Sequence, residues 1–335
     1  MVHMNQGQGE TSYAHNSSIQ NRMKPLIEAA IIDLCGSKST LFPEKMLIAD
    51  LGCSYGPNAL ALVSTAVKAI INHCLQFQQP PPEVCVLLND LPDNDFNTVV
   101  KSLATLRQSN NKLFTSDSLH LVCSSNSLHW LSMAPEDLTM NQIPAYDMDE
   151  HARRERLPMV REAYARQFRK HFILFLELRA KELVPGGRMV VSLVGRPSNV
   201  KASKFFHLWE TLVQILSVMA LEGVIDKAKF DSFYVPVYGP SGEELREIIQ
   251  DEGSFSISDM RVYDAATDMN SMLFTPSSFV NYLRAIFEPI IVEHFGEVMD
   301  EFVRTAERRW SLEGSMQDER ARNPRAMLAV SLVKA

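Results

Sequence analysis

A short apolar run early in the chain contains an aspartate near its end and is followed by two glycines. Met46 to Leu51 is apolar except for Asp50, and Gly52 and Gly56 come just after it. A run of this length suits a buried strand and is too short for a helix. Glycine has no Cβ atom, so the backbone of such a turn can approach a ligand closely. The sequence therefore predicts a ligand site at the carboxyl end of this strand.

A second acid stands at the end of the next apolar run. Val84 to Leu88 predicts a second strand, and Asp90 follows it after one residue. In nucleotide-binding sheets an acid at this place accepts hydrogen bonds from ribose hydroxyls, which fits S-adenosylmethionine (SAM) as well as NAD. The alternative role for Asp90 is an N-cap for the segment after Pro92. Three residues separate the two glycines, which departs from the dinucleotide pattern G-x-G-x-x-G and disfavours a phosphate cradle.

A third apolar run leads into polar and aromatic residues. Ser118 to Ser125 predicts a strand, and Asn126, His129 and Trp130 follow it. Small polar residues at the carboxyl end of a strand, followed by an imidazole and an indole, indicate a loop that faces a substrate. Taken alone, the His-Trp pair is better explained by ordinary packing.

The elements that must position these residues alternate between strands and helices. We expect strands over 46–51, 84–88, 118–125, 188–194, 255–263 and 325–333, and helices over 16–35, 59–74, 163–183, 205–223, 242–251 and 276–303. Residues 136–160 are charged and irregular, which is typical of a solvated face. The alternation predicts a largely parallel sheet covered by helices. The helical insertions between the later strands predict a cap over the carboxyl ends of the strands.

Composition excludes several classes of protein. The 335 residues are 46% hydrophobic and 22% charged, with a net charge of −7 and no basic stripe, which argues against a nucleic-acid partner. Five scattered cysteines without a C-x-x-C pair indicate a reduced, cytoplasmic protein without zinc or disulfides. The amino-terminal residues lack the apolar core of a signal peptide, and no run approaches the ~20 apolar residues of a membrane span.

Five stretches together resemble one family. They are Gly9-Glu10-Thr11-Ser12-Tyr13 with Asn16-Ser17-Ser18-Ile19-Gln20; Ala49-Asp50-Leu51-Gly52-Cys53-Ser54 with Gly56-Pro57-Asn58; Leu88-Asn89-Asp90-Leu91-Pro92 with Asn94-Asp95-Phe96; Ser124-Ser125 with Ser127-Leu128-His129-Trp130-Leu131-Ser132; and Glu182-Leu183-Val184-Pro185-Gly186-Gly187-Arg188-Met189. In this order they are similar to the plant SABATH family, the salicylate, benzoate and theobromine type methyltransferases. The resemblance spans nearly the whole chain.

The resemblance implies a fold and a reaction. The reaction is methyl transfer from SAM to the carboxylate of a small plant acid such as salicylate, benzoate or jasmonate, commonly by a homodimer. The fold is α/β, a class I methyltransferase sheet of the Rossmann-like kind with an α-helical cap. The core would comprise residues 21–135, 163–200, 242–265 and 323–335, and the cap residues 136–162, 201–241 and 266–322.

The resemblance also assigns residues to roles. Contacts to the cofactor would come from Tyr13, Ser17, Cys53, Asn58, Asp90 and Leu91. Gln20 and Trp130 would orient the acceptor carboxylate, in a pocket lined by Asn126, His129, Trp209, Tyr238, Leu283 and Ile286. The family is also described with a magnesium site, whose positions match Asp147, Asp231, Phe233 and Tyr234. Asparagine is usual in the family at Tyr234 and common at Asp147, and from the residues themselves a surface pair of acids without a metal is favoured.

The chemistry of the acceptor and one departure from the family leave alternatives open. A carboxylic acid is ionised at neutral pH and needs no general base, whereas an amine or phenol would, and His129 keeps an N-methylating function open. Only eleven residues lie between Leu106 and Ser118, where family members carry a further strand and a segment that closes over adenine. We therefore expect a sheet without one edge strand and weaker cofactor binding. A non-catalytic acid-binding relative is the alternative, and an NAD oxidoreductase ranks third.

Overall fold

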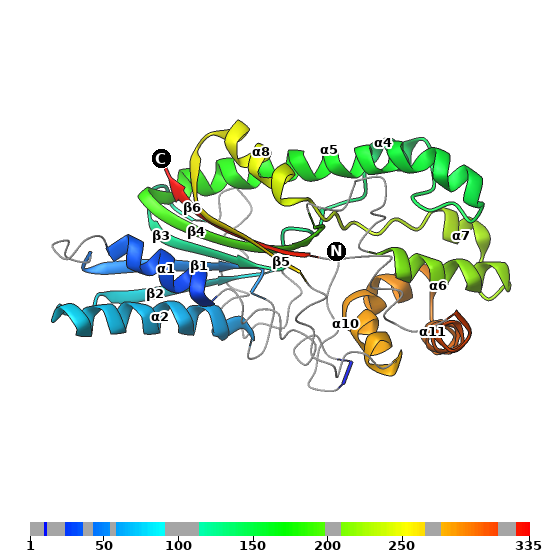
Figure 1. Ribbon diagram of the computed structural model, residues 1–335, viewed down its shortest axis with the longest axis horizontal. Coiled ribbons are helices and arrows are strands. Elements are labelled where there is room, and N and C mark those ends of the chain that lie inside the picture. The colour runs from blue at the N-terminus through cyan, green and yellow to red at the C-terminus, as the bar shows by residue number, and fades with distance from the viewer. Residues whose placement is uncertain are drawn as a thin grey trace.

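One mixed sheet organises the molecule. A computed structural model of the protein describes residues 10–11, 24–35, 43–53, 58–90, 114–197, 209–264, 276–313 and 326–335. The strands are β1 (Lys45–Leu51), β2 (Glu83–Asn89), β3 (Leu119–Ser125), β4 (Leu183–Gly195), β5 (Phe255–Asp264) and β6 (Ala326–Lys334). These six described strands lie in the order β2-β1-β3-β4-β6-β5 (Figure 1).

Four of these strands are parallel. β1 pairs parallel with β2 and β3, and β3 pairs parallel with β4, so their carboxyl ends meet at one edge of the sheet. β6 runs antiparallel between β4 and β5. β2 is an outermost strand of the described sheet. Residues 91–113, where the family carries a further strand, lie outside the described residues.

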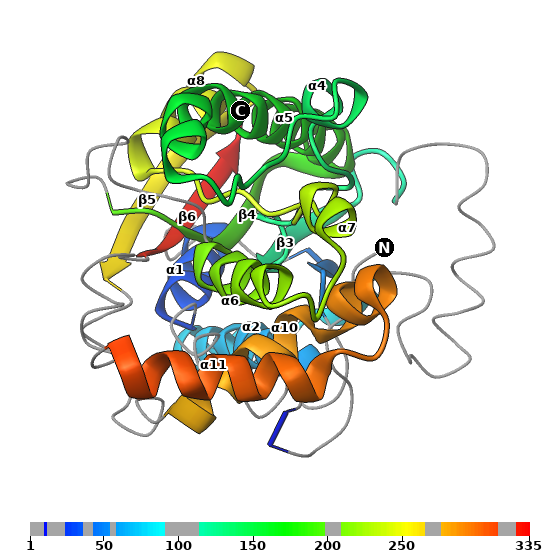
Figure 2. The ribbon, with the colours of Figure 1, turned by 90° about the vertical axis from the view of Figure 1, so that its right-hand side faces the viewer.

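Helices form two layers and a cap. α1 (Lys24–Cys35) and α2 (Asn58–Phe77) cover one face of the sheet, and α5 (Glu150–Glu182) and α8 (Gly242–Glu252) cover the other (Figure 1). The remaining described helices are α4 (Glu136–Met140), α6 (Glu210–Leu221), α7 (Lys227–Asp231), α10 (Pro276–Phe295) and α11 (Met299–Glu313). α6, α7, α10 and α11 gather beyond the carboxyl ends of the parallel strands (Figure 2). In the described part, no helix combines the length and apolarity that crossing a membrane requires.

Alternation along the strands explains the two layers. Met46 and Ile48 of β1 are buried in the cluster that contains α1 and α2, while Ala49 and Leu51 are buried in the larger cluster on the opposite face. Successive side chains of a strand point to opposite faces, so a strand covered on both sides must be apolar throughout. Asp50 breaks this rule and is nevertheless only 1% exposed.

The helix α5 differs from the expectation. It begins at Glu150 rather than near residue 163, and the Asp149 side chain caps it by accepting a hydrogen bond of 2.8 Å from the Ala152 N–H. The prediction of an irregular stretch was therefore wrong over 150–160, because a helix that projects toward solvent also carries mostly charged side chains. α5 runs without a break through residues 162 and 163, so one helix joins the predicted core to the predicted cap. That division of the chain stays a prediction.

Two further boundaries differ from the sequence-based expectation. β4 begins at Leu183, not after the Pro-Gly-Gly stretch. The pairing of β3 with β4 shifts there, from Leu119 opposite Leu183 to Leu121 opposite Arg188, and this irregularity in β4 accommodates those residues. The long helix expected over 276–303 is two helices, α10 and α11. Gly296 has a φ of 87°, a conformation that ends helices readily when no Cβ is present, and it separates the two.

Candidate active site

The turn after β1 is fastened to the end of β2. The N–H groups of Gly52 and Cys53 both donate to the Asn89 carbonyl, at 2.8 and 3.2 Å. Gly52 has a φ of 75°, and a Cβ atom placed on it would lie 2.4 Å from Cβ of Ser127. Only glycine fits both the backbone conformation and the close approach. This turn places the carboxyl end of β1 directly beside Asp90.

The segment after β3 is held by short polar contacts. The Ser124 and Ser127 hydroxyls lie 2.7 Å apart, and the Ser127 hydroxyl donates to the Leu51 carbonyl at 3.4 Å. The Asn126 N–H donates to the Ser192 carbonyl at 2.9 Å, and Asn126 itself has a φ of 55°. Asparagine tolerates this left-handed conformation better than most residues. The loop that carries the predicted acceptor residues is therefore tied to both neighbouring strands.

Three side chains at this edge bury polar atoms without a protein partner. Both carboxylate oxygens of Asp50, Oδ1 of Asn126 and Nδ1 of His129 are shielded from solvent and form no hydrogen bond within the described residues. An unsatisfied buried polar atom costs about 1–3 kcal/mol, and a charged one more. Native proteins leave few such groups, and each calls for an explanation such as a ligand. Their location at the carboxyl ends of β1 and β3 is where α/β sheets bind ligands.

Burial sets the protonation states of these groups. Burial, and next the charge of Asp90, raise the pKa of Asp50 to about 7. Burial lowers the pKa of His129 to about 4, so its imidazole is neutral at physiological pH. Burial, reinforced by Asp50 and Asp90, raises the pKa of the Cys53 thiol. The edge therefore carries two acids, a neutral imidazole and an unreactive thiol, which is a binding environment rather than a nucleophilic one.

Trp130 is held between the segment of residues 235–238 and the cap. It forms an isolated antiparallel bridge with Val237, and the Tyr238 N–H donates to the His129 carbonyl at 3.0 Å. On its other side the Trp130 ring lies 5.9 Å from the ring of Phe287 on α10. His129 and Trp130 thus belong to a rigid junction between the sheet and the cap.

The other residues predicted to line the acceptor pocket lie around this junction. Tyr238 is adjacent to His129, and its hydroxyl donates to Glu244 at 2.7 Å. Trp209 is fully buried and donates from its indole to the Val237 carbonyl at 3.3 Å. Leu283 and Ile286 belong to α10, the helix that reaches Trp130 through Phe287.

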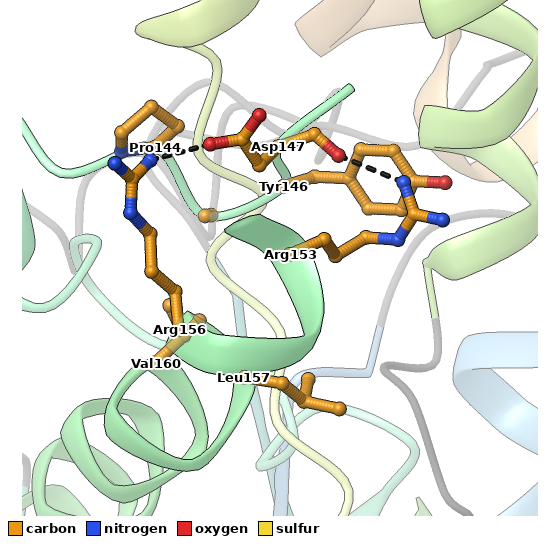
Figure 3. Close-up of a pocket in the computed structure, with 8 residues that line it drawn as sticks. Pro144, Tyr146, Asp147, Arg153, Arg156, Leu157 and Val160 are labelled. Atoms are coloured by element: carbon orange, nitrogen blue, oxygen red, sulfur yellow. Dashed lines mark hydrogen bonds and ion pairs between the residues drawn. The ribbon is translucent and has the colours of Figure 1, made fainter. Parts of the chain in front are cut away.

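The residues matched to a magnesium site do not form one. Asp147 is paired with Arg156, and Arg153 donates to the Asp147 carbonyl at 2.8 Å, beside a shallow surface pocket (Figure 3). Asp231 pairs with Lys227 at 2.5 Å. The Tyr234 hydroxyl, in place of the family's asparagine, donates to the Ile143 carbonyl at 3.0 Å. Phe233 packs its ring against Phe295 at 5.0 Å.

A metal has no suitable ligand cluster in this region. Within the described ranges, no group of three or more His, Cys, Asp or Glu side chains is arranged to hold a metal ion. Hard divalent cations require several free oxygen ligands, and here the two carboxylates already face protein cations. The residues present therefore do not fit magnesium.

Several predicted contacts cannot be placed. Tyr13, Ser17, Gln20 and Leu91 lie outside the described residues, and Asn58 is the first residue of α2. Sequence reasoning did not assign a role to Asp50. The signal was available, because an acid inside an otherwise apolar parallel strand must be explained.

The whole chain, residues 1–335, matches the family described as SAM dependent carboxyl methyltransferase. The protein belongs to this family. It is 38% identical to "Jasmonate O-methyltransferase" of Arabidopsis thaliana, over 90% of this chain and 91% of that protein. It is 37% identical to "S-adenosyl-L-methionine:benzoic acid/salicylic acid carboxyl methyltransferase 3" of Petunia hybrida, over 90% of both chains.

A solved structure supports the same assignment. The structure "Loganic acid methyltransferase with SAH" superposes with a TM-score of 0.80 at 26% identity, over 99% of this chain and 98% of that one. The predicted SABATH membership and the α/β class I methyltransferase fold are thereby confirmed. The chain is a member of a family of SAM-dependent carboxyl methyltransferases.

Proposed function

We propose that this carboxyl methyltransferase transfers the methyl group of SAM to a small plant acid of the jasmonate, salicylate or benzoate kind. The observation that carries the proposal is the set of buried, unpartnered polar atoms of Asp50, Asn126 and His129 at the carboxyl edge of the sheet. Family membership supplies the reaction, and two groups of similar relatives, named for jasmonate and for benzoate and salicylate, supply the substrate classes.

The residues of the pocket suit an acceptor that is already ionised. A carboxylate attacks a methyl group without losing a proton, so the protein has to bind it, orient it and exclude water. With a pKa of about 4, His129 is a weak base, which favours a carboxylate over an amine or phenol acceptor. The Trp130 indole can only donate hydrogen bonds, so it is suited to a carboxylate oxygen.

The acids at the ends of β1 and β2 fit SAM. Asp90 would hold the ribose hydroxyls, and the unpartnered carboxylate of Asp50 would receive the positively charged amino group. Gly52 lets the turn after β1 approach Ser127 closely, because a Cβ atom there would meet the Ser127 side chain. When bound, SAM supplies the electrophilic methyl group.

The direct test is a substrate screen. The full-length protein would be incubated with methyl-labelled SAM and jasmonate, salicylate, benzoate, anthranilate or indole-acetate, with benzamide as a control that has no carboxylate. We expect a labelled methyl ester from at least one acid and none from benzamide. If the protein binds S-adenosylhomocysteine (SAH) and these acids but forms no ester, the non-catalytic alternative is correct. Labelled N-methyl-anthranilate would instead identify an N-methyltransferase.

Replacing Trp130 by phenylalanine should reduce turnover of the acceptor acid and leave cofactor binding unchanged. The variant keeps an aromatic ring against Phe287 and removes the indole N–H. Loss of that donor leaves a buried carboxylate oxygen unsatisfied, at a cost of about 1–3 kcal/mol. We expect kcat/KM for the acid to fall about 10- to 100-fold, with an unchanged dissociation constant for SAH by calorimetry. A variant that turns over like the parent would show that another donor holds the carboxylate.

Replacing Asp50 by asparagine should stabilise the free protein and weaken cofactor binding. The pKa of Asp50 rises from 3.8 to about 7 on folding, so between these values the folded state binds more protons than the unfolded state. Stability is therefore lost as the pH rises through this window. At pH 8 we expect the free energy of unfolding of the Asp50→Asn variant to exceed that of the parent by about 1–3 kcal/mol, and its melting temperature to lie a few degrees higher. At pH 4 the two proteins should differ little.

Calorimetry with SAH completes this test. The same variant should bind SAH at least tenfold more weakly, because the cationic amino group loses its carboxylate partner. A variant that is more stable and yet binds SAH more weakly is expected only if the acid serves to bind the ligand. If the variant binds SAH as tightly as the parent, Asp50 has no part in the site.

We also propose a homodimer and a cytoplasmic location. A homodimer is supported by the exposed apolar side chains of Ile32 on α1 and of Ile71 and Leu75 on the neighbouring helix α2. Light scattering coupled to gel filtration would measure the mass directly. A cytoplasmic location remains a prediction from the cysteine pattern, and imaging of a tagged chain in plant cells would test it.

A further inference from the structure

Arg161 occupies an inward-facing position of a largely apolar helix stripe. On α5, residues three or four apart share a face, and Arg161 is followed on this face by Tyr164, Phe168 and Phe172. These three aromatic side chains are buried in the main core. Arg161 itself is half-buried. Burying a guanidinium at such a position costs free energy unless a negative charge and hydrogen-bond acceptors pair with it.

One nitrogen of this guanidinium has no hydrogen-bond partner in the described part of the protein. It is Nη2 of Arg161, which is shielded from solvent. Arg188 and Arg309 each also bury one unpartnered nitrogen, but Arg188 lies 3.6 Å from Asp33. Arg179 and Arg196 are paired, with Glu182 at 2.8 Å and with Glu244 at 2.7 Å. The titratable groups around Arg161 are Arg196, Glu210 and the Tyr238 hydroxyl, which is neutral at physiological pH.

These neighbours do not neutralise Arg161. Glu210 attracts it, but Oε1 of that acid already accepts a hydrogen bond of 2.8 Å from Gln214. Arg196 repels it, and burial together with this repulsion lowers the pKa of Arg161. An arginine remains protonated at neutral pH even so. The site thus holds an incompletely matched positive charge.

The position of Arg161 connects it to the acceptor residues. Further along the same stripe, the Tyr164 hydroxyl donates to the Val235 carbonyl at 3.1 Å, and the Phe168 ring lies 5.3 Å from the ring of Tyr238. The segment of residues 235–238 is the one that pairs with His129 and Trp130. Arg161 therefore lies near the segment of residues 235–238, which borders the proposed acceptor pocket.

We propose that Arg161 recognises the negative charge of the acceptor acid, as a binding residue in addition to Trp130. The inference rests on the proposed function, because it takes the pocket beside His129, Trp130 and Tyr238 as the acceptor pocket. The guanidinium attracts an anionic acid and discriminates against a neutral molecule of the same shape. The ligand class is a small organic anion, with its own charge as the recognised feature.

Binding measurements test this with matched ligands and matched variants. Dissociation constants would be measured by calorimetry in saturating SAH for salicylate, benzoate and jasmonate, each beside its neutral carboxamide. The variants are Arg161→Gln and Arg161→Lys. The control is Arg166→Gln, on the same helix, where the arginine is exposed and paired with Asp137 and Glu162.

We expect Arg161→Gln to bind the preferred acid about tenfold more weakly, and its carboxamide as the parent does. Arg161→Lys should retain most of the affinity, and Arg166→Gln all of it. The affinity of the parent for the acid should decrease with ionic strength more steeply than that of Arg161→Gln.

Two results would overturn the proposal. One is parent-like binding of all three acids by Arg161→Gln. The other is an equal loss for the acid and for its carboxamide, which would assign Arg161 to packing alone. These readouts are of binding, whereas the proposed function fails in the parent protein if it forms no methyl ester, so the two failures are distinguishable.

Discussion

The Asp90→Ala variant is expected to bind SAH about a hundredfold more weakly than the parent, or worse. Asp90 follows β2 directly and lies close enough to Asp50 and Cys53 for its charge to raise the pKa of both. At this place its carboxylate would accept hydrogen bonds from two ribose hydroxyls. Hydrogen bonds to charged groups contribute about 1.5–3 kcal/mol each, and about 3 kcal/mol corresponds to a hundredfold in affinity.

Calorimetry with SAH measures this effect, with Asp251→Ala as the control. Asp251 is also an acid at the end of a secondary-structure element, but it is exposed and paired with Arg169 on the surface. A second readout comes from Asp50, whose pKa should fall once the neighbouring charge is gone, so the melting temperature should depend less on pH between 4 and 7. A folded Asp90→Ala variant with the parent's affinity would remove Asp90 from the cofactor site.

The Glu182→Ala variant is expected to lose about 3–5 kcal/mol of stability, the usual cost of breaking a buried ion pair. Glu182 is fully buried and accepts two hydrogen bonds from Arg179, at 2.8 and 2.9 Å. Its Oε1 also accepts the Phe114 N–H at 3.3 Å. Without the acid, the charge of Arg179 stays buried without its bidentate partner. The melting temperature should fall by several degrees in calorimetry.

A double variant separates the ion pair from the packing. Arg179→Leu combined with Glu182→Leu removes both charges and should recover part of the loss, because apolar replacement of a buried pair is often close to neutral. Glu182 lies at the amino end of β4, away from the carboxyl edge, so Glu182→Ala should bind SAH normally below its melting temperature. Weaker binding by the folded variant at low temperature would contradict this separation.

Local patterns were sufficient to predict the strands that carry the proposed cofactor site. β1 and β2 differ from the predicted ranges by at most one residue at either end, because a continuous apolar run bounded by polar residues fixes a buried strand. Once the strands are placed, Gly52 and Asp90 must lie at the same edge of a parallel sheet. The proposed cofactor side of the site could therefore be predicted from spacing alone.

The acceptor side depends on contacts that spacing does not encode. The bridge between Trp130 and Val237 joins residues more than a hundred positions apart, and no local pattern indicates it. Periodicity places Arg161 on the inner stripe of α5 only after the helix is known to begin at Glu150. That the buried polar atoms of Asp50 and His129 lack hydrogen-bond partners among the described residues can be seen only once the neighbouring side chains are placed.

The position of β6 has a consequence for the growing chain. β6 lies between β4 and β5 and pairs with both, although it is the last described strand to be synthesised. At about 5–20 residues per second, β5 waits roughly 3 to 12 s for the strand that connects it to the sheet. During that interval β4 and β5 present unpaired edges to other nascent chains. Yield in a heterologous host should therefore respond to growth temperature and chaperone supply more than the stability of the finished fold suggests.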